Sequence, residues 1–141
     1  MKVVFDTNVF IAAALKGAFA EEIIELAETT DLITLITSEE ILSELKQKLL
    51  YKFDKSESNV DYFIEKVRNI AGIVSVTKRV SVVTRDPDDN KILECALSGK
   101  ADLIVTSDQD LIKLKTFRGI GLVHPKTLSW TFPEYFKKSR K

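Results

Sequence analysis

Acidic residues stand at four separate places in this sequence where carboxylates could act together. They are Asp6 after Val-Val-Phe, Glu44 in Ser-Glu-Leu, Asp89 in Asp-Pro-Asp-Asp-Asn-Lys, and Asp108 with Asp110 in Thr-Ser-Asp-Gln-Asp. No lysine or arginine is obviously placed to neutralise each of them. Carboxylates that share a pocket repel one another, so such a pocket needs a cation or protonated carboxyl groups. Hard divalent ions with oxygen ligands, Mg²⁺ or Mn²⁺, are the natural occupants.

Short apolar runs alternate with helical patterns, and this alternation predicts the elements that position the acids. Helices are expected after Thr7 or Asn8, over 18–30, after Ser38, after Ser56 until Gly72, from Asp89 to Gly99, from Ser107, and over 132–136. Strands are expected over 3–5, 32–36, 73–76, 80–83, 103–105 and 120–123. The alternation predicts an α/β fold with a mostly parallel sheet that is covered on both faces.

A parallel sheet gathers functional groups just beyond the carboxyl ends of its strands. Asp6 directly follows the first expected strand, and Asp108 follows the strand 103–105 after two polar residues. Asp89 opens the helix that leads into that same strand. Glu44 flanks the buried stripe of its helix, from which a long side chain can reach over the edge of the sheet.

Each acid also has a structural interpretation. Asp6 can cap a helix or begin a turn, and Glu44 taken alone is typical of a solvated helix residue. The acids of the Asp-Pro-Asp-Asp turn and of the Ser-Asp-Gln-Asp segment are typical capping residues. The complete set, rather than any single member, favours a site.

Other candidate residues favour structural roles. The single histidine, His124, and the single cysteine, Cys95, have no partner nearby in the sequence that would make a base or a nucleophile of them. A basic stretch follows Glu44 and is typical of a solvated face, although it could meet a phosphate backbone; it consists of Lys46, Lys48, Lys52 and Lys55.

The composition is that of an ordinary globular domain. The chain has 141 residues, of which 45% are hydrophobic and 30% are charged, and its 21 basic and 21 acidic residues give no net charge. This balance excludes a global attraction to nucleic acid. The sequence has no signal peptide or membrane span, so we expect a cytoplasmic protein with one domain over 1–136 and a basic tail over 137–141.

Four segments together resemble PIN-domain proteins. They are Phe-Asp-Thr-Asn-Val-Phe at 5–10, Ser-Glu-Leu at 43–45, Asp-Pro-Asp-Asp-Asn-Lys-Ile-Leu-Glu-Cys-Ala at 86–96 and Ala-Asp-Leu-Ile-Val-Thr-Ser-Asp-Gln-Asp-Leu at 101–111. The similarity covers nearly the whole chain and is greatest to toxins of prokaryotic toxin–antitoxin pairs that are related to VapC.

The resemblance implies a three-layer α/β/α fold and an endoribonuclease that uses Mg²⁺ or Mn²⁺. It implies a catalytic and metal-binding quartet of Asp6, Glu44, Asp89 and Asp108. It implies supporting roles for Thr7, Asn8, Thr106 and Asp110, and as a further supporting residue Ser107, like Thr106, could hydrogen-bond a phosphate oxygen of the substrate. Asp86 and Asp88 compete with Asp89 for the third position, and we select Asp89 because Ile92 and Ala96 then match the family helix. The resemblance also implies an RNA substrate, an antitoxin partner and a homodimer.

The leading hypothesis is hydrolysis of an RNA phosphodiester at a divalent ion held by Asp6 with Asp89 or Asp108. In this hypothesis Glu44 holds a second ion or orients the attacking water. A second hypothesis is an inert PIN-like module that binds RNA or a protein. A third is phosphoryl transfer through Asp6 as a nucleophile, although Asn8 stands where a paired Asp-x-Asp motif would have its second aspartate.

Overall fold

The computed structural model describes residues 1–15, 24–25, 27–29, 31–81 and 87–127. The strands in these segments form one sheet with the spatial order β3-β2-β1-β4-β6-β5. Their bounds are β1 (Lys2–Phe5), β2 (Thr34–Thr37), β3 (Gly72–Ile73), β4 (Leu103–Val105), β5 (Thr116–Phe117) and β6 (Ile120–Val123). All paired neighbours are parallel except β5 and β6. The predicted α/β fold with a mostly parallel sheet is therefore confirmed.

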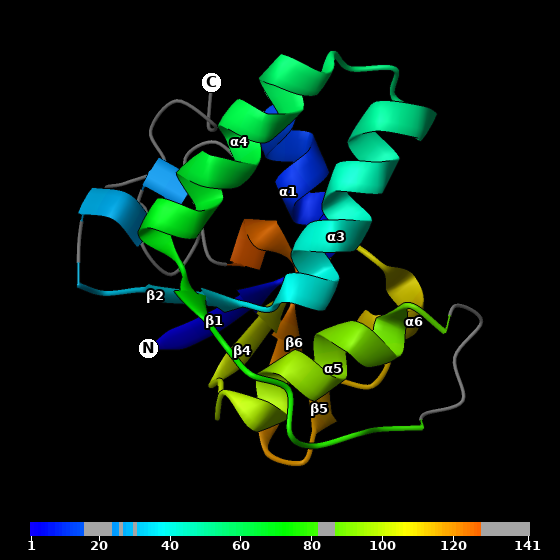
Figure 1. The fold of residues 1–141 in the computed structure, drawn as a ribbon. Coiled ribbons are helices and arrows are strands. Elements are labelled where there is room, and N and C mark those ends of the chain that lie inside the picture. Colours follow the sequence, from blue (N-terminus) through cyan, green and yellow to red (C-terminus); the bar gives the residue numbers. More distant parts are fainter. Residues whose placement is uncertain (16–23, 26, 30, 82–86, 128–141) are drawn as a thin grey trace.

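Helices cover both faces of this sheet (Figure 1). They are α1 (Thr7–Ala14), α3 (Glu39–Gln47), the π-helical turn η1 (Lys48–Lys52), α4 (Glu57–Ile70), α5 (Asp89–Ser98) and α6 (Gln109–Ile112). In Figure 1, α1, α3 and α4 gather on one side of the sheet and α5 lies on the other. Right-handed crossovers explain this division, because the chain moves outward from β1 to β3 and then returns past β1 to β4.

The central strands are apolar over most of their length because both of their faces are covered. Val3, Val4 and Phe5 of β1 are fully buried, as are Ile104 and Val105 of the neighbouring β4. Such continuous runs are typical of parallel strands packed between two helical layers. No helix in the described part of the chain is long and apolar enough to cross a membrane.

The strand predictions succeeded at the centre of the sheet and failed at its edges. The strands expected over 103–105 and 120–123 have those bounds in the structure. The strand expected over 73–76 ends at Ile73. Of the strand expected over 80–83, residues 82–83 lie outside the described residues, and Val80 lies in no strand because its N–H donates to Glu94 Oε2 at 2.9 Å. The second strand begins at Thr34, two residues later than expected, and ends at Thr37, one residue later than expected.

Helix starts show which residues carry the caps. Ser38 and Ser56 cap α3 and α4 through their side chains, as predicted. The prediction of Thr7 or Asn8 as the first cap was wrong, because Asp6 caps α1 by accepting the N–H of Asn8. Ser107 was also a wrong prediction, because the Asp108 side chain caps α6. Helix α4 ends at Ile70 with Ala71 as its C-cap, and Gly72, which was predicted to stop the helix, is the next residue and already belongs to β3.

Part of the predicted architecture lies outside the described residues. Of the helix expected over 18–30, residues 24–25 and 27–29 are described and are helical. The final turn expected over 132–136 and the tail over 137–141 lie beyond the last described residue, Thr127. The division into one domain and a tail therefore stays a prediction.

Candidate functional site

The pairing of β1 with β4 places Asp6 beside Thr106. Phe5 and Val105 are partners in the parallel register, so the next residue of each strand emerges at the same edge of the sheet. The Asp6 N–H donates to the Val105 carbonyl at 2.9 Å, which fixes the backbone there. The Thr106 hydroxyl then donates to Asp6 Oδ2 at 2.6 Å. The sheet register itself therefore builds the first contact of the site.

Further hydrogen bonds from uncharged groups connect this contact to the start of α6. Thr106 Oγ1 accepts the Asp108 N–H at 3.0 Å, and Asp108 Oδ1 accepts the Asp110 N–H at 2.8 Å. Asp6 Oδ1 accepts the Asn8 N–H at 3.3 Å. Asp6 is only 6% exposed. The resulting Asp6–Asp108 pair is held by hydroxyl and amide groups, which carry no formal charge.

A second pair of acids forms between α3 and the start of α5. Glu44 is buried, and the Thr7 hydroxyl donates to its Oε2 at 2.7 Å. Lys48 Nζ lies 3.4 Å from Glu44 Oε1, one helical turn further along the chain. The carboxyl groups of Glu44 and Asp88 are hydrogen-bonded to each other, and Lys91 Nζ lies 3.0 Å from Asp88 Oδ1. The Glu44–Asp88 pair thus has cations on both sides.

The two pairs differ in what shifts the pKa of their carboxyl groups. Burial raises the pKa of Asp6, the hydrogen bond from Thr106 opposes this, and the nearby charge of Asp108 adds to the rise. Burial also raises the pKa of Glu44, and the hydrogen bond with Asp88 raises it further. The same hydrogen bond lowers the pKa of Asp88, assisted by Lys91. The hydrogen bond between the two carboxyl groups therefore favours ionisation of Asp88 over ionisation of Glu44.

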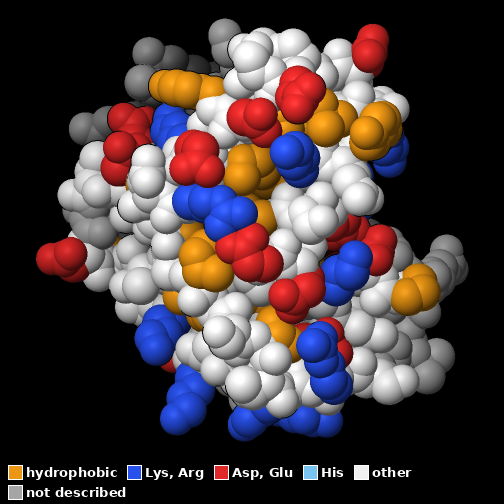
Figure 2. Space-filling view, viewed as in Figure 1, with side chains coloured by type: hydrophobic (Ala, Val, Ile, Leu, Met, Phe, Trp, Pro, Cys, Tyr) orange, Lys and Arg blue, Asp and Glu red, His pale blue; other side chains and the backbone are white. Residues whose placement is uncertain are grey.

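The expectation that no basic residue neutralises the acids was wrong for the second pair. Lys48 and Lys91 both contact carboxylates there, and Figure 2 shows basic and acidic side chains interleaved on the face formed by α3, α4 and α5. The spacing of Glu44 and Lys48 on one helix could have revealed the contact, because residues four apart are neighbours on a helix surface. Together with Asp88 and Lys91 they line an open hollow of ≈ 610 Å³.

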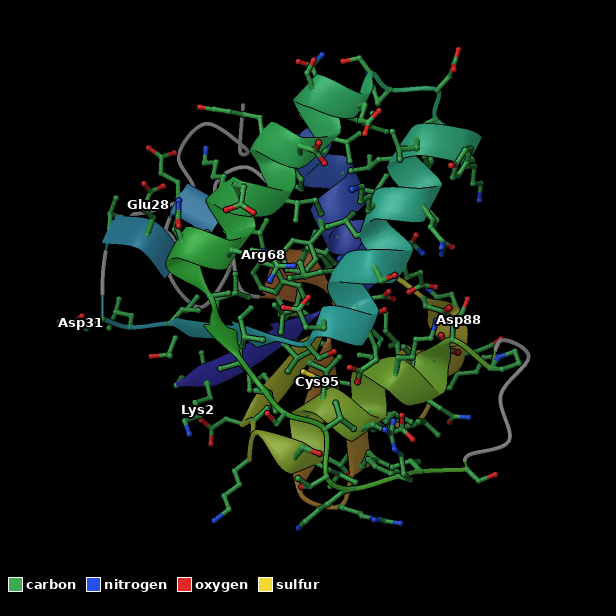
Figure 3. The ribbon with its side chains drawn as sticks, viewed as in Figure 1. Lys2, Glu28, Asp31, Arg68, Asp88 and Cys95 are labelled. Carbon is green, nitrogen blue, oxygen red and sulfur yellow. The ribbon has the colours of Figure 1, made fainter. Side chains whose placement is uncertain are left out.

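The third predicted acid, Asp89, is preceded by Asp88, which contacts another acid of the site. Figure 3 shows Asp88 at the N-terminal end of α5, where it meets Glu44. Asp89 follows in the first turn of α5 and is buried. Asp86 lies outside the described residues. The catalytic role of Asp89 stays a prediction, and the structure adds Asp88 as a residue of the site.

The predicted supporting residues differ in their contacts. Of the predicted supporting residues, Thr7 and Thr106 donate through their hydroxyl groups, Asn8 and Asp110 donate through their N–H groups, and Ser107 is exposed.

Cys95 and His124 have the structural roles that we expected. Cys95 is a buried residue of α5 (Figure 3), and burial raises the pKa of its thiol to about 12. His124 Nδ1 accepts the N–H of Lys126 at 3.1 Å, which is a local contact of the turn.

The oxygen atoms of the site suit a hard divalent ion held by few ligands. Within the described residues, no three Asp, Glu, His or Cys side chains lie close enough to hold a metal ion as a group. Mg²⁺ commonly uses only one or two carboxylates and keeps several waters, so a pair of acids is sufficient. In the same part of the chain, the buried Glu44 Oε1 accepts no hydrogen bond from an N–H or hydroxyl group. The residues therefore fit such an ion.

Comparison with known proteins identifies the family. Residues 2–110 match the PIN domain family. This chain belongs to the PIN domain family. PIN domains are typically nucleases, that is, hydrolases of phosphodiester bonds. The family membership predicted from the sequence segments is therefore confirmed.

Two similar proteins support this membership. The PIN chain is 32% identical over 120 residues to the uncharacterized protein MJ1680 of Methanocaldococcus jannaschii, and the match covers 82% of this chain and 76% of that protein. Its fold is similar to that in the crystal structure of VapBC2 from Rickettsia felis bound to a DNA fragment from their promoter, with a TM-score of 0.60. That match has 16% identity and covers 86% of this chain and 97% of the other. At such low identity the likeness concerns the fold alone.

Proposed function

We propose that this PIN domain is an endoribonuclease that depends on Mg²⁺ or Mn²⁺ and acts as the toxin of a toxin–antitoxin pair. The observation that carries the proposal is the 2.6 Å hydrogen bond from Thr106 to the buried carboxyl group of Asp6. It fixes an acid at the carboxyl edge of a parallel sheet, where such folds place their functional groups. The family membership and the likeness in fold to VapBC2 support the toxin assignment.

Asp6 and Asp108 would hold the divalent ion, and Glu44 and Asp89 would contribute through bound water. Asp6 and Asp108 form the pair held by neutral donors, so their negative charge is not cancelled by a contacting cation among the described residues. When bound, such an ion makes hydroxide available near neutral pH and neutralises charge on the phosphoryl oxygens.

The chain's own residues would supply position rather than proton transfer. Thr106 orients Asp6, and Thr7 orients Glu44, so each carboxyl group keeps one fixed direction. Preorganised groups of this kind lower a barrier because they need no rearrangement during the reaction. Ser107 is exposed beside Asp108 and would donate to a phosphate oxygen of the substrate.

The decisive experiment compares RNA cleavage by the wild type and by Asp6→Asn in purified protein with Mn²⁺. We expect the variant to cleave RNA at least about 100-fold more slowly than the wild type, which is a typical loss for one positioned catalytic group. Asp61→Asn is the matched control, because Asp61 is 52% exposed on α4 and pairs with Lys46. A chelator should stop the wild type, and a single-stranded DNA of the same sequence tests the preference for RNA. Equal cleavage by the wild type and Asp6→Asn would contradict the proposal.

One observation favours the alternative of an inert module that binds RNA or a protein. Lys48 and Lys91 already contact the Glu44–Asp88 pair, as cations do in purely structural clusters. A shift of RNA in a gel that is insensitive to chelator and yields no products would favour this alternative over the nuclease.

The proposed partners follow from the same assignment. We infer an antitoxin that inhibits the nuclease and a homodimer of this chain. Co-expression with the product of an adjacent small gene should relieve growth arrest if that product is the antitoxin. Sedimentation of the purified chain measures the oligomeric state.

A further inference from the structure

Among the basic residues that the structure describes, Lys48 is the one whose charge acts on both acidic pairs. Its Nζ lies 3.4 Å from Glu44 Oε1, an oxygen atom that accepts no N–H or hydroxyl hydrogen bond within the described segments. Its charge also lowers the pKa of Asp6 in the first pair and of Asp88 in the second. Lys91, by comparison, contacts Asp88 at the outer side of the second pair.

The backbone around Lys48 holds its side chain near the acids. Lys48 is the first residue of η1, and its N–H donates to the carbonyls of Glu44 and Leu45. Its own carbonyl accepts the Phe53 N–H at 3.1 Å, the five-residue spacing of a π-helix. The next residue, Leu49, is buried and anchors the turn. Turns of this type are frequent at functional sites, and here the turn leaves the Lys48 side chain 28% exposed.

An ammonium group and a divalent ion compete for the same carboxylate oxygens. Both are attracted by Glu44 and Asp6, and they repel each other in a partly buried place where water screens weakly. A monovalent ion has no advantage in charge over the tethered ammonium, whereas a divalent ion has. The position of Lys48 therefore affects which cations the acids can accept.

We propose that the Lys48 ammonium is the counter-ion of the acidic site in the absence of a divalent cation, and that it leaves Glu44 when such a cation binds. Lys48 is thus a residue that sets the cation affinity and selectivity of the site. This inference rests on the proposed function, because it takes a divalent cation to be the ion that the site uses.

Calorimetric titration with Mn²⁺ tests the inference on the wild type, Lys48→Met and Lys46→Met. We expect Lys48→Met to bind Mn²⁺ about tenfold more tightly, because the competing charge is gone. Lys46→Met is the matched control, since Lys46 lies two residues away, is 45% exposed and pairs with Asp61 outside the site. It should bind as the wild type does, and melting curves establish that each variant is folded.

Equal or weaker binding by Lys48→Met, with Mn²⁺ bound by the wild type, overturns this inference and leaves the proposed nuclease intact. Absence of Mn²⁺ binding in every variant overturns both.

Lysine acetylation of the unmodified protein, read by mass spectrometry, gives an independent measurement. We expect Mn²⁺ to increase the labelling of Lys48 several-fold, because the ammonium leaves Glu44 and becomes more accessible. The labelling of Lys46 should not change. Labelling of Lys48 that stays constant while Mn²⁺ binds overturns the inference without any substitution in the chain.

Discussion

The two acidic pairs of this PIN domain are built from the same side-chain type but are held in opposite ways. The Asp6–Asp108 pair receives hydrogen bonds from Thr106 and from backbone N–H groups. The carboxyl groups of Glu44 and Asp88 are hydrogen-bonded to each other, and each lies within 3.4 Å of a lysine ammonium group. The first pair lies at the edge of the sheet, and the second lies between two helices.

This difference shows how a fold can leave the negative charge of one carboxylate available to a cation while it neutralises another carboxylate. Neutral donors orient a carboxylate without cancelling its charge, so the charge remains for a cation to satisfy. A contacting lysine already balances most of the negative charge of a carboxylate. We therefore expect the Asp6–Asp108 pair to dominate cation binding and the Glu44–Asp88 pair to modulate it.

The largest expected effect is a difference in Mn²⁺ affinity between variants of the two acidic pairs. The absence of this difference would contradict the distinction between the pairs. Asp6→Asn should weaken binding about 100-fold, whereas Glu44→Gln should weaken it about tenfold, because Glu44 is already partly neutralised. Calorimetric titration of the two variants measures both losses. Equal losses would mean that the two pairs contribute alike.

An intermediate effect on stability should distinguish the two threonines. Thr106→Val removes a buried hydroxyl that both donates to Asp6 and accepts from Asp108, so we expect a loss of about 2 kcal/mol in the free energy of unfolding. Thr7→Val removes the donor to Glu44 and should cost about 1 kcal/mol. Urea denaturation measures both values. A larger loss for Thr7→Val would reverse the ranking of the two pairs.

The smallest expected effect is a gain in stability from Asp6→Asn that depends on pH. The pKa of Asp6 in the folded state is raised above its ordinary value of 3.8, mainly by burial. Below that ordinary value Asp6 is protonated in both states, and as the pH rises through the folded pKa the wild type must ionise a buried group. The variant should therefore be more stable by on the order of 1 kcal/mol near neutral pH, and this gain should vanish in acid.

Melting temperatures from about pH 3 to about pH 7.5 measure this gain. Asp61→Asn is again the control, because Asp61 lies on the exposed face of α4. A gain for Asp6→Asn that grows in acid would contradict the explanation by burial.

Much of the fold could be predicted from local sequence because the deciding interactions span few residues. The strands 103–105 and 120–123 are short apolar runs, and Ser38 and Ser56 cap helices through side chains that reach only three residues ahead. The two-residue strand β5 was missed because a segment so short carries no periodic pattern. The π-helical turn η1 was missed because its sequence fits an ordinary helix equally well.

The candidate site was predictable as a set of acids but not as a set of contacts. The sequence segments name Asp6, Glu44 and Asp108, and each of these has a polar partner at the site. The choice between Asp88 and Asp89 depends on the residue at which α5 begins. A shift of the helix start by one residue changes which of the two carboxyl groups contacts Glu44. Local pattern does not determine at which residue the helix begins.

By itself the sequence determined the class of fold, the order of the central strands and helices along the chain, and the chemical type of the site, because apolar runs, caps and acidic segments act over short distances. Only the tertiary structure decided which groups meet. Thr7 and Glu44 are 37 residues apart and Thr106 and Asp6 are 100 residues apart, and both contacts depend on strand register and helix packing. Those contacts determine which carboxyl groups keep their charge available and which are already neutralised by Lys48 and Lys91.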